Sequence, residues 1–107
     1  MPSAFDDREK TFEKGFANDE ALRFHAGARR NKAVALWIAD MKGLSGEAAE
    51  KYADDFVSTH VGASDDAVAA ALKQDAARGD IDISDHRLRK KMAKEMAAAT
   101  AAIKAGT

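Results

Sequence analysis

Four stretches of this chain place apolar residues at helical spacing, and short segments that contain Gly or Ser separate them. The chain holds a single proline and no cysteine, and helix-favouring Ala, Glu, Lys and Arg are abundant. Short connections make neighbouring helices antiparallel. For 107 residues, these features predict an all-α fold, namely one four-helix bundle (residues 18–107) preceded by a mobile N-terminal arm (residues 1–17).

The helix ends are predicted from capping residues and glycines. The first helix is expected to start at Asn18 or Asp19 and to stop at Gly43. Ser45, Ser64 and Ser84 are expected to cap the next three helices, with DIDI as the loop before the last one. The predicted buried positions are Phe24, Ala28, Val34, Ala35, Trp37, Ile38, Met41, Ala48, Ala49, Tyr52, Ala53, Phe56, Val57, Val68, Ala71, Leu72, Leu88, Met92, Met96, Ala99 and Ile103.

The N-terminal arm, MPSAFDDREKTFEKGF, does not fit the bundle pattern. On an ideal helix its Phe5, Phe12 and Phe16 would fall within about 40° of one another and form one apolar stripe. Three phenylalanines without a core do not offset the entropy lost when the arm becomes ordered. We therefore expect the arm to be disordered alone and to fold against a partner groove. An arm stapled onto its own bundle is an equally open alternative.

Composition excludes several function classes. A formal net charge of -1 gives no reason to expect nucleic-acid binding. The acidic N-terminus lacks the apolar run of a signal peptide, and no stretch approaches the ~20 apolar residues of a membrane span. The protein is expected in the cytoplasm, without direct membrane insertion. No nucleophile–base pair is visible, so nothing in the sequence indicates an enzyme.

Acidic residues and histidines give no convincing metal site. DIDISD resembles the start of a calcium loop, but Asp85 and Lys91 occupy the positions that require Gly and Glu. The three histidines lie on different predicted helices, and no two of them share zinc-helix spacing. The Asp65–Asp66 pair is explained by the positive end of a helix. We therefore expect no metal.

Two basic clusters carry alternative readings. Arg29, Arg30 and Lys32 together with Trp37 would suit an adenine nucleotide, with the cations on phosphates and the indole stacked on the base. A solvated basic face is the favoured interpretation of the same residues. In RLRKKMAK, near the C-terminus, a core face with a solvated basic side is favoured over a membrane-binding or partner-binding helix.

Several motifs together resemble a known family. FDDRE, an FA.D motif followed by an aromatic residue, ARRN, a Trp-centred segment, and LSG followed by YA lie in the first half. LRKKM at residues 88–92 continues the likeness, which covers nearly the whole chain, although a proline common in the acidic turn at residues 62–68 is missing. These motifs resemble the zeta ATPase-inhibitor subunit of alphaproteobacterial F-type ATP synthases, formerly a family of unknown function.

The resemblance implies a four-helix bundle whose N-terminal segment inserts into the catalytic interface of the alpha and beta subunits, close to the gamma rotor. Inserted there, the segment would block ATP hydrolysis by stopping rotation, and the protein would lie at the inner membrane only through the synthase. The inhibitory residues implied are those of FDDRE and the phenylalanines that follow: Phe5, Asp6, Asp7, Arg8, Glu9, Phe12 and Phe16.

One departure affects this expectation. Gly15 stands where members of that family commonly carry Lys, and it weakens a bound helix by ~1 kcal/mol. Three hypotheses stay open: an inhibitory regulatory subunit, which we favour, a small adenine-nucleotide-binding protein without other cofactors, and a helical scaffold whose arm folds back.

Overall fold

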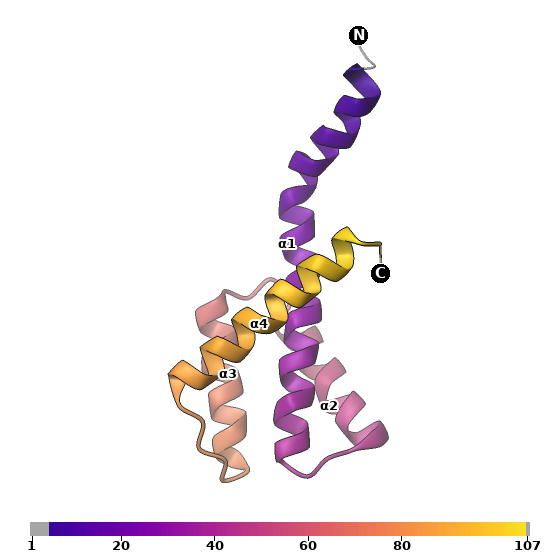
Figure 1. Ribbon diagram of the computed structural model, residues 1–107. Coiled ribbons are helices and arrows are strands. Elements are labelled where there is room, and N and C mark those ends of the chain that lie inside the picture. Colours follow the sequence, from indigo (N-terminus) through magenta and orange to yellow (C-terminus); the bar gives the residue numbers. More distant parts are fainter. Residues whose placement is uncertain (1–4, 107) are drawn as a thin grey trace.

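The computed structural model describes the backbone of residues 5–106 and the side chains of residues 19–106. It confirms the predicted all-α class, with four helices in the described range. They are α1 (Phe5–Met41), α2 (Gly46–Thr59), α3 (Asp65–Arg78) and α4 (Asp85–Lys104). Short connections reverse the chain direction between them, and α4 crosses α1 obliquely (Figure 1). Within the described part, no helix has the length and apolarity that crossing a membrane requires.

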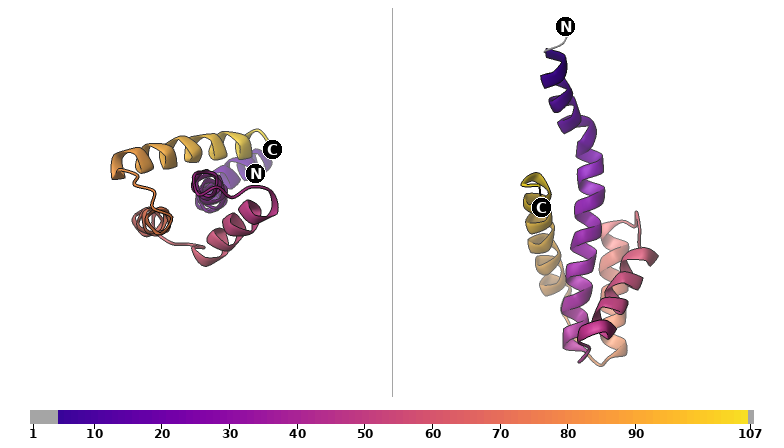
Figure 2. Two further views of the ribbon diagram at one scale, coloured as in Figure 1. Left: turned by 90° about the horizontal axis from the view of Figure 1, so that it is seen from below. Right: turned by 90° about the vertical axis from the view of Figure 1, so that its right-hand side faces the viewer.

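Helix α1 lies at the centre of the bundle. It packs against each of α2, α3 and α4, and the end-on view of Figure 2 shows the three others arranged around it. Its buried face carries Ala26, Ala35 and Ala39, each fully shielded from solvent, and small side chains let neighbouring helices approach closely. A bundle with few aromatic residues thus builds its core around one shared helix.

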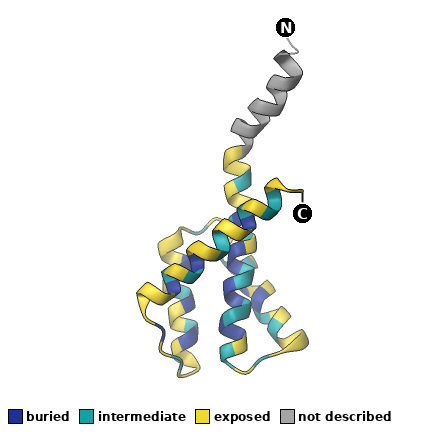
Figure 3. Ribbon diagram, viewed as in Figure 1, coloured by how far each residue is buried: buried dark blue, intermediate teal, exposed yellow. Residues whose placement is uncertain are grey.

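About half of the predicted buried positions are buried and most of the others are half-buried. The buried faces point inward in Figure 3. Five buried apolar residues were not predicted, namely Ala26, Ala39, Ala69, Ala76 and Ile83, the last of which belongs to the predicted DIDI loop and has only 2% of its surface exposed. Phe24 and Ala48 are exposed, so their predicted burial was wrong. The cluster consists of Val34, Ala35, Ile38, Ala53, Phe56, Val68, Ala69, Leu72, Ala76, Ile83, Leu88 and Met92.

The predicted helix starts were right for α2, α3 and α4. Ser64 and Ser84 cap α3 and α4, and each hydroxyl accepts a hydrogen bond of 3.1 Å from the backbone N–H three residues later. Ser45 precedes α2 as predicted, but its side chain makes no capping hydrogen bond. The predicted start of α1 at Asn18 or Asp19 was wrong, because the helix runs unbroken through both residues from Phe5.

Two helices end in the same hydrogen-bonded turn. Gly43 after α1 has φ +86°, and the next N–H donates to the Ala39 carbonyl over 2.9 Å. Asp80 after α3 has φ +59°, and the following N–H donates to the Ala76 carbonyl over 2.9 Å. This pattern is the Schellman stop, in which Gly is the usual left-handed residue. Asp80 therefore ends a helix in the segment that resembled a calcium loop.

Tyr52 links α2 to α3 through a side-chain hydrogen bond. Its hydroxyl donates to the Asp75 carboxylate over 2.8 Å, and the Lys42 ammonium lies 4.8 Å from the centre of its ring. Burial, and then the hydrogen bond to Asp75, raise the pKa of the phenol above its ordinary value. The neutral phenol is therefore the form that the folded protein stabilises.

Because Tyr52 is the sole tyrosine, its ionisation is directly measurable by ultraviolet absorbance. We expect phenolate to form above the ordinary pKa of about 10 in the folded protein, and near about 10 in urea. The raised folded-state pKa contributes stability that is complete below about pH 10 and is lost as the pH rises further. Tyr52→Phe should lower the free energy of unfolding at neutral pH by about 0.5–1.5 kcal/mol. A folded-state titration identical to that in urea would contradict this assignment.

Candidate functional site

The residues proposed for nucleotide binding lie on α1 but point toward different neighbours. Arg30 pairs with Asp65 of α3, whereas Lys32 pairs with Glu50 and Asp54 of α2. Trp37 faces the cations of α4. The structure therefore directs Arg30, Lys32 and Trp37 to three different neighbours and not into one pocket.

Arg30 is buried, so the expectation of a solvated face was wrong for this residue. Only 6% of its side chain is exposed, and its Nη1 donates to Asp65 Oδ1 over 3.0 Å. Its Nε donates to Asn31 Oδ1, also over 3.0 Å. A buried guanidinium requires such partners, because removing its charge from water is costly. ARRN is in this respect a structural motif.

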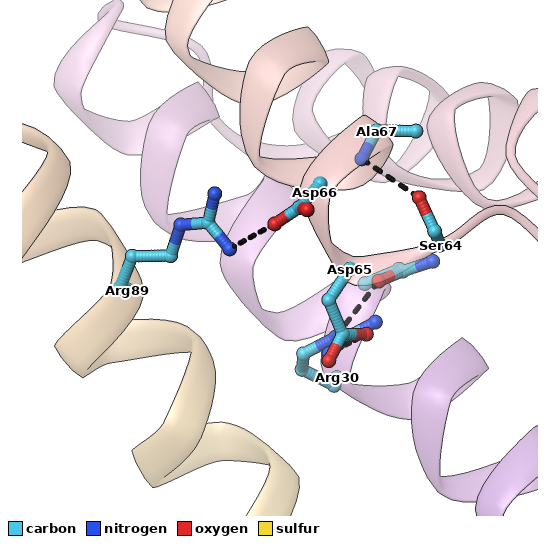
Figure 4. Close-up of polar contacts among 7 residues, drawn as sticks. Arg30, Ser64, Asp65, Asp66, Ala67 and Arg89 are labelled. Carbon is cyan, nitrogen blue, oxygen red and sulfur yellow. Dashed lines mark hydrogen bonds and ion pairs between the residues drawn. The ribbon is translucent and has the colours of Figure 1, made fainter.

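The N-terminus of α3 is held from two sides by ion pairs (Figure 4). Asp65 pairs with Arg30 of α1, while Asp66 accepts from Arg89 Nη1 of α4 over 2.8 Å. The hydrogen bond from Arg89 to Asp66 raises the pKa of that guanidinium above its ordinary value. The two acidic residues explained in sequence by the helix dipole thus also join three helices.

Lys32 is compensated by two carboxylates. Its ammonium lies 3.1 Å from Glu50 Oε1 and 3.3 Å from Asp54 Oδ1. The hydrogen bond to Glu50, and then the one to Asp54, raise the pKa of Lys32. These exposed pairs add little to stability. They neutralise the positive charge of Lys32, which a bound phosphate would need.

Trp37 is half-buried beside the basic side of α4. The Arg87 guanidinium lies 5.2 Å and the Lys91 ammonium 5.4 Å from its ring centre. Lys91 also pairs with Glu95 over 2.9 Å. Leu88 and Met92 of the same helix are in the core, as the favoured interpretation of RLRKKMAK predicts.

A surface groove lies where α1 meets the connection between α2 and α3. One hollow of about 600 Å³ contains Phe24, Val57 and Val61, and a second of about 720 Å³ runs along α4. The two hollows share Arg30, Asp65 and Met96. Sequence periodicity missed this groove because it placed Phe24 in the core and gave no role to Val61.

The remaining candidate residues give no site in the described region. Among side chains 19–106, no group of three His, Cys, Asp or Glu residues is arranged to hold a metal ion. His25 and His86 are exposed, and the His60 ring lies 4.1 Å from that of Phe56. Phe5, Asp6, Asp7, Arg8, Glu9, Phe12 and Phe16, the predicted inhibitory residues, lie outside the described side chains.

The Arg30–Asp65 pair gives a test of whether ARRN is structural. Asp65→Asn leaves the buried guanidinium without its carboxylate and should cost about 1–3 kcal/mol in unfolding free energy. Arg30→Met should cost less, about 1 kcal/mol or below, because Asp65 is 73% exposed and keeps its hydration. Chemical denaturation measures both values, with Lys73→Gln on the exposed face of α3 as the control. Equal losses for the two variants would contradict the structural role.

Comparison with known proteins identifies one family. No curated protein and no solved structure matches the chain. The model of the family described as "ATPase inhibitor subunit zeta" matches residues 2–102, that is, nearly all of the arm, α1, α2 and α3, and α4 up to residue 102. This chain therefore belongs to the ATPase inhibitor subunit zeta family.

Proposed function

We propose that this protein is a non-catalytic regulatory subunit that inhibits ATP hydrolysis by the F-type ATP synthase. The observation that carries the proposal is the family match over residues 2–102, since it includes the arm as well as the bundle. In this proposal the arm, residues 1–17, enters the interface of the catalytic alpha and beta subunits beside the gamma rotor. The protein works in the cytoplasm and reaches the inner membrane through the synthase.

The composition of the arm suits insertion between protein subunits. Phe5, Phe12 and Phe16 would share one helical face, and an apolar stripe of this kind binds in a groove between partner surfaces. The backbone of α1 is helical from Phe5 onward, which is the conformation that this mode of binding uses. The phenylalanines supply the buried area and thus most of the affinity.

Charged residues of the arm would orient it in the cleft. In the sequence, Arg8 follows Asp6 and Asp7 and precedes Glu9, so one turn of a helical arm would carry both signs of charge. Charge pairs across an interface fix the register and suppress wrong partners. The four helices then act as a stop that limits how far the arm enters.

Deleting the arm tests the proposal directly. Full-length protein and a version lacking residues 1–17 are added to an alphaproteobacterial F-type ATPase depleted of its own inhibitor, and the rate of ATP hydrolysis is measured. We expect inhibition by the full-length chain only, because the phenylalanine stripe is lost with the arm. Circular dichroism of the truncated chain checks that the bundle remains folded. Unchanged hydrolysis with the full-length chain, or equal inhibition by both chains, would refute the proposal.

Gly15 gives a second, finer prediction. Alanine stabilises a helix interior by ~1 kcal/mol relative to glycine. If the arm binds as a continuous helix through Phe12 and Phe16, Gly15→Ala should lower the half-inhibitory concentration by about fivefold. The same hydrolysis assay measures it, with Lys14→Ala as a control at a neighbouring position. Weaker inhibition by Gly15→Ala would instead show that the arm needs a hinge at this residue.

A further inference from the structure

We propose that the groove beside α1 is a second docking surface of this protein, which holds an apolar segment with carboxylates on the inhibited ATPase. The groove consists of the two adjoining hollows formed by residues 20–31 of α1, residues 57–65 and residues 89–104 of α4. This inference rests on the proposed function and names the surface by which the bundle, rather than the arm, contacts the enzyme.

The apolar side chains of the groove are the first argument. Phe24 is 51% exposed and Val61 is 62% exposed, and these are the two large apolar side chains that stand out as exposed in the part of the chain with described side chains. Both line the same hollow, although one comes from α1 and the other follows α2. Exposed apolar residues that gather in a hollow mark binding surfaces more often than scattered ones do.

The charges of the groove indicate the chemistry of the occupant. Its charged lining residues are Arg23, Arg30, Arg89, Lys104, Glu20 and Asp65. Arg30 pairs with Asp65, and Arg89 with Asp66 just outside the lining. In the described structure this leaves two cations, Arg23 and Lys104, against one carboxylate, Glu20. Such a lining favours a segment that brings carboxylates beside its apolar side chains.

The position of the groove relative to the arm is the third argument. Phe16 and Phe24 are eight residues apart in one helix, which corresponds to about 12 Å along its axis. An enzyme surface that encloses the arm therefore lies next to the groove. Figure 2 shows α4 and the connection between α2 and α3 on opposite flanks of α1, and α1 continues from between them toward the arm.

The experiment compares groove variants in the depleted-ATPase assay. Phe24→Ser with Val61→Ser should raise the half-inhibitory concentration by about tenfold or more, while inhibition at saturation stays complete because the arm is intact. Arg23→Gln should raise it by a few-fold, whereas Lys73→Gln, an exposed cation outside the groove, should not. Thermal melting of each variant separates loss of docking from loss of folding, since Phe24 and Val61 are exposed and their replacement should leave the melting temperature unchanged.

Site-specific cross-linking supplies an independent readout. The chain has no cysteine, so Val61→Cys and Lys73→Cys each carry a single thiol for a photoactivatable label. We expect the label at residue 61, and not at residue 73, to join the inhibitor to the purified ATPase. Cross-links between two inhibitor copies, or protection by adenine nucleotide alone, would assign the groove to another occupant and overturn the inference. If every groove variant has the same half-inhibitory concentration as the unaltered full-length chain, and that chain inhibits, the docking surface is refuted while the proposed function stands.

Discussion

The burial of Arg30 is the interaction on which the arrangement of this bundle depends. A guanidinium with 6% of its side chain exposed must be compensated, and the Asp65 carboxylate does so from the first turn of α3. Because Asp66 of the same turn pairs with Arg89 of α4, the start of α3 is fixed relative to both α1 and α4. Few large side chains fill this core, so directional pairs of this kind help to select one packing.

Local features of the fold were readable from the sequence because local interactions determine them. The hydroxyls of Ser64 and Ser84 reach backbone N–H groups only three residues away, so neither cap depends on tertiary structure. The burial of Arg30 depends instead on a residue 35 positions further along the chain. A basic run such as ARRN looks the same whether it faces solvent or a distant carboxylate, and sequence periodicity cannot distinguish the two.

The groove is a second case in which sequence periodicity cannot show whether a residue is covered, here for apolar residues. Phe24 has the helical spacing of a core residue, but no neighbouring helix covers it. Val61 was expected at the end of the second helix, outside its buried stripe, but α2 ends at Thr59 and Val61 lines the same hollow as Phe24. The apolar pattern of α1 thus extends beyond the part of the helix that its neighbours cover, and the uncovered residues become candidates for binding.

Helix α1 therefore serves two demands that conflict. Within the bundle its small buried residues, such as Ala35 and Ala39, allow three helices to pack around it. Toward its N-terminus the same helix carries Phe24, which the bundle leaves 51% exposed beside Val61 in the groove. An inhibitor that buried these residues in its own core would be more stable but would have no apolar surface for its target. A binding role therefore requires that part of α1 remains uncovered by the other helices.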